Sequence, residues 1–208
     1  MKISVSILNA EDKKKTIKKL NNADISYFHI DVMDGKFVSQ KSLPVEETIK
    51  LSKISEKKLD IHLMHSSPLT YIEQLKELKN IEYITIHLEI EENIKEILDK
   101  IKTYGFKRGI SIKPNTDINK LIPYLDNIDL ILIMTVEPGL GGQEFLESSP
   151  NRIKEIKELI KEKNILLEVD GGINDKTIKL VNEANISVVG SYITKSNDML
   201  EQIKKLTI

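Results

Sequence analysis

The sequence predicts a (β/α)8 barrel on three observations: strand and helix patterns alternate, eight such pairs occur, and several strands have one polar face. Alternating strands and helices are typical of parallel βα units. Dividing 208 residues by eight leaves 26 residues for each pair, which suits a small barrel. No linker rich in Pro, Gly or Ser divides the chain, so residues 1–208 are predicted to form a single domain.

Short runs rich in β-branched residues predict the strands, and charged segments with helical periodicity predict the helices. The expected strands lie near residues 2–8, 25–31, 59–64, 82–88, 108–113, 129–135, 165–170 and 186–190. The expected helices lie near residues 11–20, 44–55, 68–79, 91–103, 117–122, 149–163, 174–183 and 197–206. Pro68 and Pro150 suit the first turn of a helix, and Asn174 and Asn197 are expected to be N-caps. The fifth helix is the weakest because Pro123 follows it closely.

The alternation of side chains along the strands favours the barrel over an open doubly wound sheet, which is the second choice. On the second strand, Phe28 and Ile30 share one face, while His29 and Asp31 share the other. The third, fourth and seventh strands divide in the same way. An open sheet covered by helices on both sides would be apolar on both faces. The polar residues gather toward the carboxyl ends of the strands, where barrel enzymes hold their active sites.

Composition excludes several classes of function. The chain carries 31 basic and 32 acidic residues, and its net charge of −1 argues against a general polyanion binder. Four Phe, six Tyr and no Trp offer little stacking surface for nucleic acid. The absence of Cys excludes disulfides and thiolate chemistry. No stretch approaches the ~18 apolar residues of a membrane span, and the first residues read as a strand rather than a signal peptide. We therefore expect a cytoplasmic protein that binds neither nucleic acid nor membrane.

Polar residues at the ends of three strands predict a divalent-metal site. His29 and Asp31 project together from one strand, and His62 and Asp170 end two others with the same orientation. Two imidazoles and two carboxylates would suit Zn, Fe, Mn or Co, so one divalent metal ion of undetermined identity is expected. The alternative interpretation is a set of ordinary hydrogen-bonded polar residues at the mouth of a barrel.

Glycine-rich loops after the last three strands predict a phosphate site. They lie at residues 137–143, 170–172 and 190–191. Glycine lets backbone N–H groups approach an anion closely, and barrels often bind phosphate at the loops after strands 7 and 8. Each loop taken alone would also fit a tight turn. Arg108 and Arg152 are the only arginines, which excludes a multi-arginine clamp on an anion.

Several of these motifs resemble those of the ribulose-phosphate 3-epimerase family. Residues 29–38, with the sequence HIDVMDGKFV, resemble the signature of that family. Other segments resemble it in the same order along the chain, at residues 4–8, 60–64, 84–89, 135–145, 169–173 and 190–191. The resemblance therefore covers nearly the whole chain.

The resemblance implies an isomerase of the pentose phosphate pathway that interconverts D-ribulose 5-phosphate and D-xylulose 5-phosphate. It implies one metal ion held by His29, Asp31, His62 and Asp170, with Asp31 and Asp170 also acting as the catalytic acid/base pair. It also implies a homo-oligomer whose partner is a phosphorylated ketose substrate. The residues expected at the substrate are Ser6, Met33, His62, Met64, Met134, Gly139, Gly141, Gly142, Gln143, Gly171, Gly172, Gly190 and Ser191.

Two carboxylates suit this chemistry. Inverting C3 of the sugar requires a proton to leave one face and another to arrive at the opposite face, so one carboxyl must be ionised and the other protonated. The departing proton is α to the C2 carbonyl, which makes the intermediate a 2,3-enediolate. A metal ion near its oxygens would stabilise the charge by several kcal/mol.

The chain departs from the family pattern in one loop, which leaves a second substrate open. Ser39 and Gln40 stand where the family commonly has Pro-Asn, and residues 41–44 lack the usual glycine-containing stretch. A longer ketose phosphate such as D-allulose 6-phosphate is therefore the main alternative. Barrel lyases and decarboxylases generally use a Lys at the strand ends and lack the two His with two Asp. A non-catalytic sugar-phosphate-binding barrel would be expected to have lost a ligand or an acid/base residue, and none is lost here.

Five further polar residues receive secondary predictions. His65 is either a fifth ligand or, as we favour, a solvated loop residue. His87 and Glu89 are expected to support the ligands or to form buried hydrogen bonds rather than to bind the metal. Glu168 is expected to be a hydrogen-bonded interior residue. Lys113 would either pair with a carboxylate or extend toward solvent.

Overall fold

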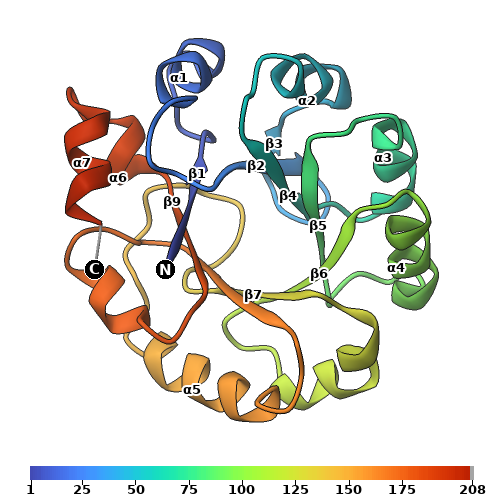
Figure 1. The fold of residues 1–208 in the computed structure, drawn as a ribbon. Helices are drawn as coiled ribbons and strands as arrows, with labels where there is room; N and C mark the ends of the chain where they lie inside the picture. The colour runs from blue at the N-terminus through green and yellow to red at the C-terminus, as the bar shows by residue number, and fades with distance from the viewer. Residues whose placement is uncertain (207–208) are drawn as a thin grey trace.

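The computed structural model describes residues 1–206 and shows a closed ring of strands surrounded by helices (Figure 1). The barrel strands are β1 (Lys2–Ser6), β2 (Tyr27–Asp34), β4 (Lys58–Met64), β5 (Ile81–His87), β6 (Lys107–Ile112), β7 (Leu130–Met134), β8 (Leu166–Asp170) and β9 (Ile186–Val189). All neighbouring pairs among them run parallel, and β1 closes the ring by pairing with both β2 and β9. The predicted (β/α)8 barrel is confirmed.

Helices pack around the outside of the strands (Figure 1). The α-helices are α1 (Lys13–Leu20), α2 (Val45–Ser52), α3 (Pro68–Leu75), α4 (Ile94–Thr103), α5 (Ser149–Leu159), α6 (Ser191–Thr194) and α7 (Met199–Lys205), and the 3-10 helices are η1 (Ile118–Asn127) and η2 (Thr177–Val181). Helix α4 shows how the sequence specifies them. Its apolar residues at Ile94, Ile97, Leu98 and Ile101 are buried on one face, and Asn93 caps its first turn.

Some predicted boundaries were wrong, each for a local reason. The first strand ends at Ser6 rather than residue 8 because the Ser6 hydroxyl accepts the N–H of Leu8 and turns the chain. The second strand begins later than expected and continues to Asp34. Its end pairs antiparallel with a two-residue strand that was not predicted, β3 (Lys41–Ser42).

The predicted helices at 117–122 and 174–183 are 3-10 helices with different bounds. The segment η1 continues past Pro123, which has no N–H for an α-helical ladder. The N-cap position of η2 is Lys176 and not Asn174 as predicted, because the helix begins at Thr177. Asn174 lies two residues earlier, and its side-chain oxygen accepts the N–H groups of Lys176 and Thr177. The cap of α7 is Asp198 and not Asn197 as predicted, since the Asp198 carboxylate accepts the N–H of Glu201 at 3.0 Å.

The barrel separates two kinds of core. Between strands and helices lies a large apolar layer that includes Phe28 and Ile30, both fully buried. Inside the barrel, the amino-terminal end is closed by apolar contacts that include Tyr27 and Tyr83, whose rings meet edge to face at 5.7 Å. Above them the interior becomes polar, as predicted from the strand alternation. Among residues 1–206, no helix is both long enough and apolar enough to cross a membrane.

Candidate metal centre and phosphate pocket

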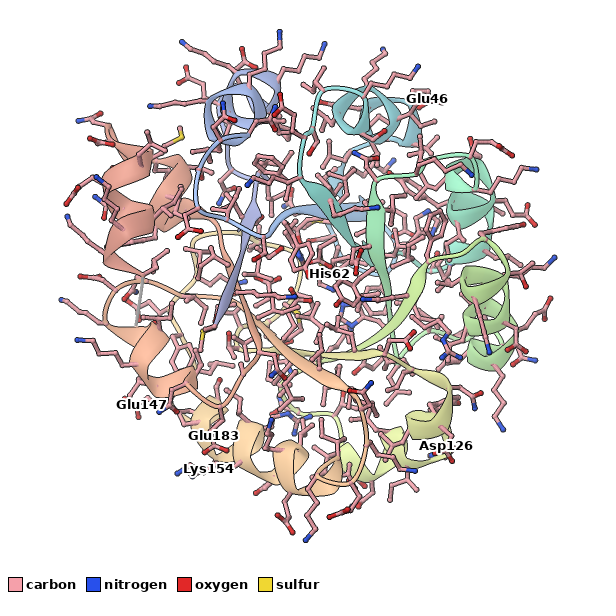
Figure 2. All side chains as sticks on the ribbon, in the orientation of Figure 1. Glu46, His62, Asp126, Glu147, Lys154 and Glu183 are labelled. Atoms are coloured by element: carbon pink, nitrogen blue, oxygen red, sulfur yellow. The ribbon has the colours of Figure 1, made fainter. Side chains whose placement is uncertain are left out.

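Four polar side chains meet at the carboxyl ends of the strands. His29 and Asp31 project from β2, His62 from β4 and Asp170 from the end of β8. One ligand-type atom from each lies within 4.8 Å of the others. His62 lies in the middle of the ring of strands, whereas Glu46, on helix α2, lies at the periphery of the molecule (Figure 2). The structure therefore brings together the four residues predicted as ligands.

The strand register explains this meeting. Asp31 of β2 lies beside His62 of β4, and the preceding inward residue of β2, His29, lies beside Asp60. Asp170 ends β8 opposite Met134 of β7. Because inward-facing residues recur every second position, residues separated by more than 100 positions in the chain share one layer of the interior.

Two buried nitrogen atoms in this cluster are free to bind a cation. His29 Nε2 lies 3.4 Å from Asp31 Oδ1, and His62 Nδ1 lies 3.4 Å from the same oxygen. Each nitrogen lies 3.8 Å from Asp170 Oδ2. Within the described part of the chain neither nitrogen has a hydrogen-bond partner, although both side chains are fully buried. Imidazole nitrogens and carboxylate oxygens form a donor set that suits a divalent transition metal, so these residues fit such an ion.

The second ring nitrogen of His29 explains why its Nε2 is available. His29 Nδ1 lies 2.6 Å from Asp60 Oδ2, and the same oxygen accepts the hydroxyl of Ser4 at 2.9 Å. A carboxylate in this position accepts the Nδ1–H and leaves the lone pair of Nε2 for a metal, which is the usual support of a metal-binding imidazole. Asp60 lies on the polar face of the third predicted strand, and its role as the partner of His29 was not predicted from the sequence.

Glu168 lies below this pair and completes it. The carboxyl group of Glu168 and the Oδ1 atom of Asp60 are fully buried. If both carboxyl groups were ionised, no group among residues 1–206 would donate a hydrogen bond to these oxygens. Burial, together with the negative charge of Asp60, raises the pKa of Glu168 well above its ordinary value. The raised pKa favours the protonated form of Glu168. Glu168 is thus the interior residue predicted from the sequence, but the predicted hydrogen bond is not seen, because neither of its oxygens has a partner among residues 1–206.

The two aspartates of the cluster differ in acidity. Burial by itself would raise the pKa of Asp31, but His29 and His62 lower it well below its usual range. Asp31 Oδ2 also accepts the hydroxyl of Ser6 at 2.7 Å. For Asp170, burial and the negative charge of Asp31 raise the pKa to about 6, against the opposing effect of the two imidazoles. One carboxyl is thus held ionised while the other binds a proton more readily, as an acid/base pair requires.

A cavity of about 560 Å³ opens above the cluster. Asp31 and Asp170 reach it, whereas His62 is fully buried beneath. All the other residues predicted at the substrate line this cavity, namely Ser6, Met33, Met64, Met134, Gly139, Gly141, Gly142, Gln143, Gly171, Gly172, Gly190 and Ser191. Their roles toward a ligand remain predictions, but the structure places them around one space.

Glycine is required at particular points of the loops around this cavity. Gly172 has a φ of +68°, and a Cβ there would lie 2.5 Å from the backbone nitrogen of Phe145. Gly142 also has a positive φ, and the nearest side-chain atom to its missing Cβ is Ser191 Oγ at 3.3 Å. The Gln143 side-chain amide donates to two carbonyl groups of its own loop. The loops after β7, β8 and β9 therefore pack closely and expose backbone to the cavity.

Asn9 joins these loops, although no motif in the sequence predicted this role. Its Nδ2 donates to Ser191 Oγ at 2.8 Å, and it also lines the cavity. Asp34 is a second residue that was missed. Its carboxylate accepts the N–H groups of Lys36 and Phe37 and both the N–H and hydroxyl of Ser66.

The structure shows the surroundings of two residues for which the sequence left two interpretations open. His65 lies outside the cluster, and its Nδ1 accepts the N–H of Ser67 at 3.0 Å, as expected of a loop residue. The ammonium group of Lys113 lies 4.2 Å above the ring of Phe37, while its backbone N–H donates to Glu89. The remaining two residues, His87 and Glu89, form the hydrogen bonds that were predicted for them. His87 contacts His62, and Glu89 contacts His87.

The fold and the site define the class of protein: a (β/α)8-barrel enzyme with a cluster of imidazoles and carboxylates at the carboxyl ends of its strands. Its particular family follows from comparison with known proteins. The model of the ribulose-phosphate 3 epimerase family matches residues 2–194, and the chain belongs to this family.

Named relatives agree with the assignment. The ribulose-phosphate 3-epimerase of Helicobacter pylori is 38% identical over 204 residues, covering 95% of this chain and 93% of the relative. That of Bacillus subtilis is 33% identical over 213 residues, covering 99% and 98%.

Solved structures show the same fold at low sequence identity. The 3-hexulose-6-phosphate synthase from Salmonella typhimurium has a TM-score of 0.69 at 15% identity and covers 99% of this chain and 96% of its own. A mutant tryptophan synthase α-subunit from Pyrococcus furiosus has a TM-score of 0.74 at 14% identity, covering 99% and 96%. These two similarities support the barrel architecture.

Proposed function

We propose that this chain interconverts D-ribulose 5-phosphate and D-xylulose 5-phosphate by epimerisation at C3. The observation that carries the proposal is the pair of aspartates, Asp31 and Asp170, at the floor of a cavity whose rim is built from glycine loops. Family membership supports the reaction, and the geometry supports the roles of the residues.

In this proposal Asp31 and Asp170 exchange protons with the two faces of C3. The ionised Asp31 removes the C3 proton of one epimer, and the protonated Asp170 delivers a proton to the opposite face. The roles are exchanged when the reaction runs in reverse. Ser6 holds Asp31 through its 2.7 Å hydrogen bond, which fixes the direction of the carboxylate.

We further propose that His29, Asp31, His62 and Asp170 hold one divalent cation, either Zn, Fe, Mn or Co. When bound, such an ion would supply positive charge against the oxygens of a 2,3-enediolate. Met33, Met64 and Met134 line the cavity next to this floor and would exclude water without competing for protons.

The phosphate group is proposed to bind at the other side of the cavity. Backbone N–H groups of the loops after β7, β8 and β9 would receive it, with Ser191 as a hydroxyl donor. This arrangement explains why the chain needs no arginine clamp. The contacts expected are those of Gly139, Gly141, Gly142, Gln143, Gly171, Gly172, Gly190 and Ser191.

Proton NMR in D₂O tests the reaction and its mechanism together. Purified protein would be mixed with D-ribulose 5-phosphate, with and without a chelator, and xylulose 5-phosphate formation and deuterium entry at C3 would be followed. Chelator-sensitive epimerisation with labelling at C3 is expected. If the folded, metal-loaded protein gave no turnover, the pentulose assignment would be wrong, and D-allulose 6-phosphate would be the next substrate to test.

Two further proposals rest on the family resemblance alone. We propose that the chain works as a homo-oligomer, which light scattering during gel filtration would contradict if it gave the mass of one chain at working concentration. We also propose that it acts in the cytoplasm, and fractionation of the source cells that recovered it elsewhere would contradict this.

A further inference from the structure

A line of hydrogen bonds leads from His62 away from the metal cluster toward the rim of the barrel. His62 Nε2 lies 2.9 Å from His87 Nε2, and His87 Nδ1 lies 3.1 Å from Glu89 Oε2. Both imidazoles are fully buried, and their ring centroids are 5.0 Å apart. Each nitrogen of the line therefore has one neighbour with which it can share a proton.

Glu89 is fixed at the outer end of this line. Its Oε1 accepts the N–H of Lys113 at 2.9 Å and the hydroxyl of Thr116. Arg152 Nη2 donates to the carbonyl groups of Lys113 and Thr116 and so holds the segment that supplies both donors. These bonds leave Oε2 for His87. Burial would raise the pKa of Glu89, but the hydrogen bonds from His87, Thr116 and the backbone of Lys113 lower it to about 2.

The order of donors and acceptors follows from Glu89. An ionised carboxylate can only accept, so His87 Nδ1 must carry the proton that points toward it. A neutral His87 then has a lone pair on Nε2, which can only accept the proton on His62 Nε2. His62 Nδ1 is left with a lone pair, and this is the atom that lies 3.4 Å from Asp31 Oδ1.

We propose that Glu89 and His87 are positioning residues that fix the tautomer of His62 and thereby present its Nδ1 to the bound cation. This inference rests on the cation site proposed above and not on the identity of the sugar. A free neutral imidazole carries its proton on either nitrogen, so an unsupported His62 would spend part of its time with a proton on the ligating atom. Fixing the tautomer removes that competition before the metal arrives.

The ring of Phe37 covers the same line from the side. The centroid of the Phe37 ring lies 4.6 Å from that of His87. The Lys113 ammonium group lies over the Phe37 ring, 4.2 Å from its centroid. Phe37 comes from the segment after β2, so the loop that departs from the family pattern is attached to the support of a metal ligand. The packing excludes water from the bond between His87 and His62, both of which have no exposed surface.

Glu89→Gln is a sharp test because it changes protons and leaves shape nearly unchanged. The donors from Lys113 and Thr116 keep the amide oxygen at the Oε1 position, so the new NH₂ group faces His87. His87 Nδ1 must then accept, its Nε2 must donate, and His62 must carry its proton on Nδ1. The opposite amide orientation would set two N–H groups against each other and leave both without an acceptor, which disfavours it.

The tautomers of the parent protein can be read directly. The chain has four His, so zinc-loaded protein labelled with ¹⁵N-His should give four resolvable ring patterns in long-range ¹⁵N–¹H spectra. We expect His62 protonated at Nε2 and bound through Nδ1, and His87 protonated at Nδ1. A proton on His87 Nε2, or binding of His62 through Nε2, would overturn the proposal without any substitution being needed.

Zinc affinity measured against a competing chelator supplies the second readout. Glu89→Gln should bind Zn²⁺ about 10–100-fold more weakly than the parent. Glu82→Gln is the matched control, because Glu82 lies on β5, the strand that carries His87, but pairs with Lys107 at the surface. Equal affinities of parent and Glu89→Gln would overturn the positioning role alone. Failure of the parent itself to bind one Zn²⁺ per chain would overturn the cation site, and the positioning role with it.

Discussion

Asp170→Asn should have opposite effects on catalysis and on the stability of the metal-free fold. The substitution keeps the size of the side chain and one oxygen, and removes the acid/base group proposed for one face of C3. Loss of one such group typically lowers turnover by about 10²–10⁴-fold, or about 3–5 kcal/mol at 1.36 kcal/mol for each factor of ten. Asp31 would remain able to exchange the C3 proton of one epimer.

The stability effect has a definite sign. The pKa of Asp170 is raised from 3.8 to about 6, so above pH 6 the folded, metal-free protein carries a carboxylate that its surroundings disfavour. About two pH units at 1.36 kcal/mol each give a penalty of up to about 3 kcal/mol. It develops as the pH rises from about 4 to 6 and is absent below the unfolded pKa. Asp170→Asn removes it, so the metal-free variant should be more stable than the parent at pH 7 and equally stable below pH 4.

Two assays and one control examine this reasoning. Deuterium exchange and epimerisation would be followed by NMR in metal-loaded protein, and urea unfolding would be measured after chelation at both pH values. Asp126→Asn is the control, because that side chain is 82% exposed and lies on the outer surface. A variant with full metal content that epimerises within about tenfold of the parent would refute the acid/base role. A metal-free variant less stable than the parent at pH 7 would refute the electrostatic argument.

Three further outcomes are expected from substitutions around the site. Asp34→Ala should lower the free energy of unfolding by about 1–3 kcal/mol near neutral pH, because a half-buried carboxylate with several donors is lost. The pKa of Asp34 lies well below the usual range, so the difference in urea unfolding should shrink as the pH falls below about 4, and a constant difference would contradict this. Gly172→Ala should raise the KM for the sugar phosphate by at least about tenfold. Gly105→Ala is the control and should leave the KM unchanged, because Gly105 also has a positive φ but no atom lies within 4 Å of the new Cβ. Equal KM values for the two variants would argue against the role of the phosphate loop. Asn9→Ala should raise KM several-fold with little change in kcat by freeing Ser191, and steady-state kinetics showing the reverse pattern would exclude that role.

The sequence predicted the barrel and the four-residue cluster because strands have a strict period of two. Once His29 and Asp31 were assigned to one strand, their common direction followed without knowledge of any other element. The strand positions were also given by short β-branched runs. The local sequence pattern alone was therefore enough to predict where each of these residues lies on its strand and to which face of the strand its side chain points.

Features that depend on the register between strands or on side-chain rotation were not accessible. Asp60 meets His29 because β2 and β4 pair with one particular offset, which no local pattern encodes. The contact of His87 with His62 depends on the rotation of two rings. Two of the predicted helices are 3-10 helices, and the helical period in the sequence did not distinguish this tighter geometry from an α-helix.

The hydrogen bond from Asn9 to Ser191 also has a consequence for the time at which this protein becomes functional. It joins residues 182 positions apart, and the pairing of β1 with β9 closes the barrel between the same two ends of the chain. At a synthesis rate of about 5–20 residues per second, roughly 10–40 s pass on the ribosome between the appearance of the two partners. During that interval β1 lacks β9, one of its two neighbours, and the rim of the phosphate pocket cannot form. A nascent chain would therefore be unable to retain sugar phosphate until its last strand is made, and ligand could stabilise only completed chains.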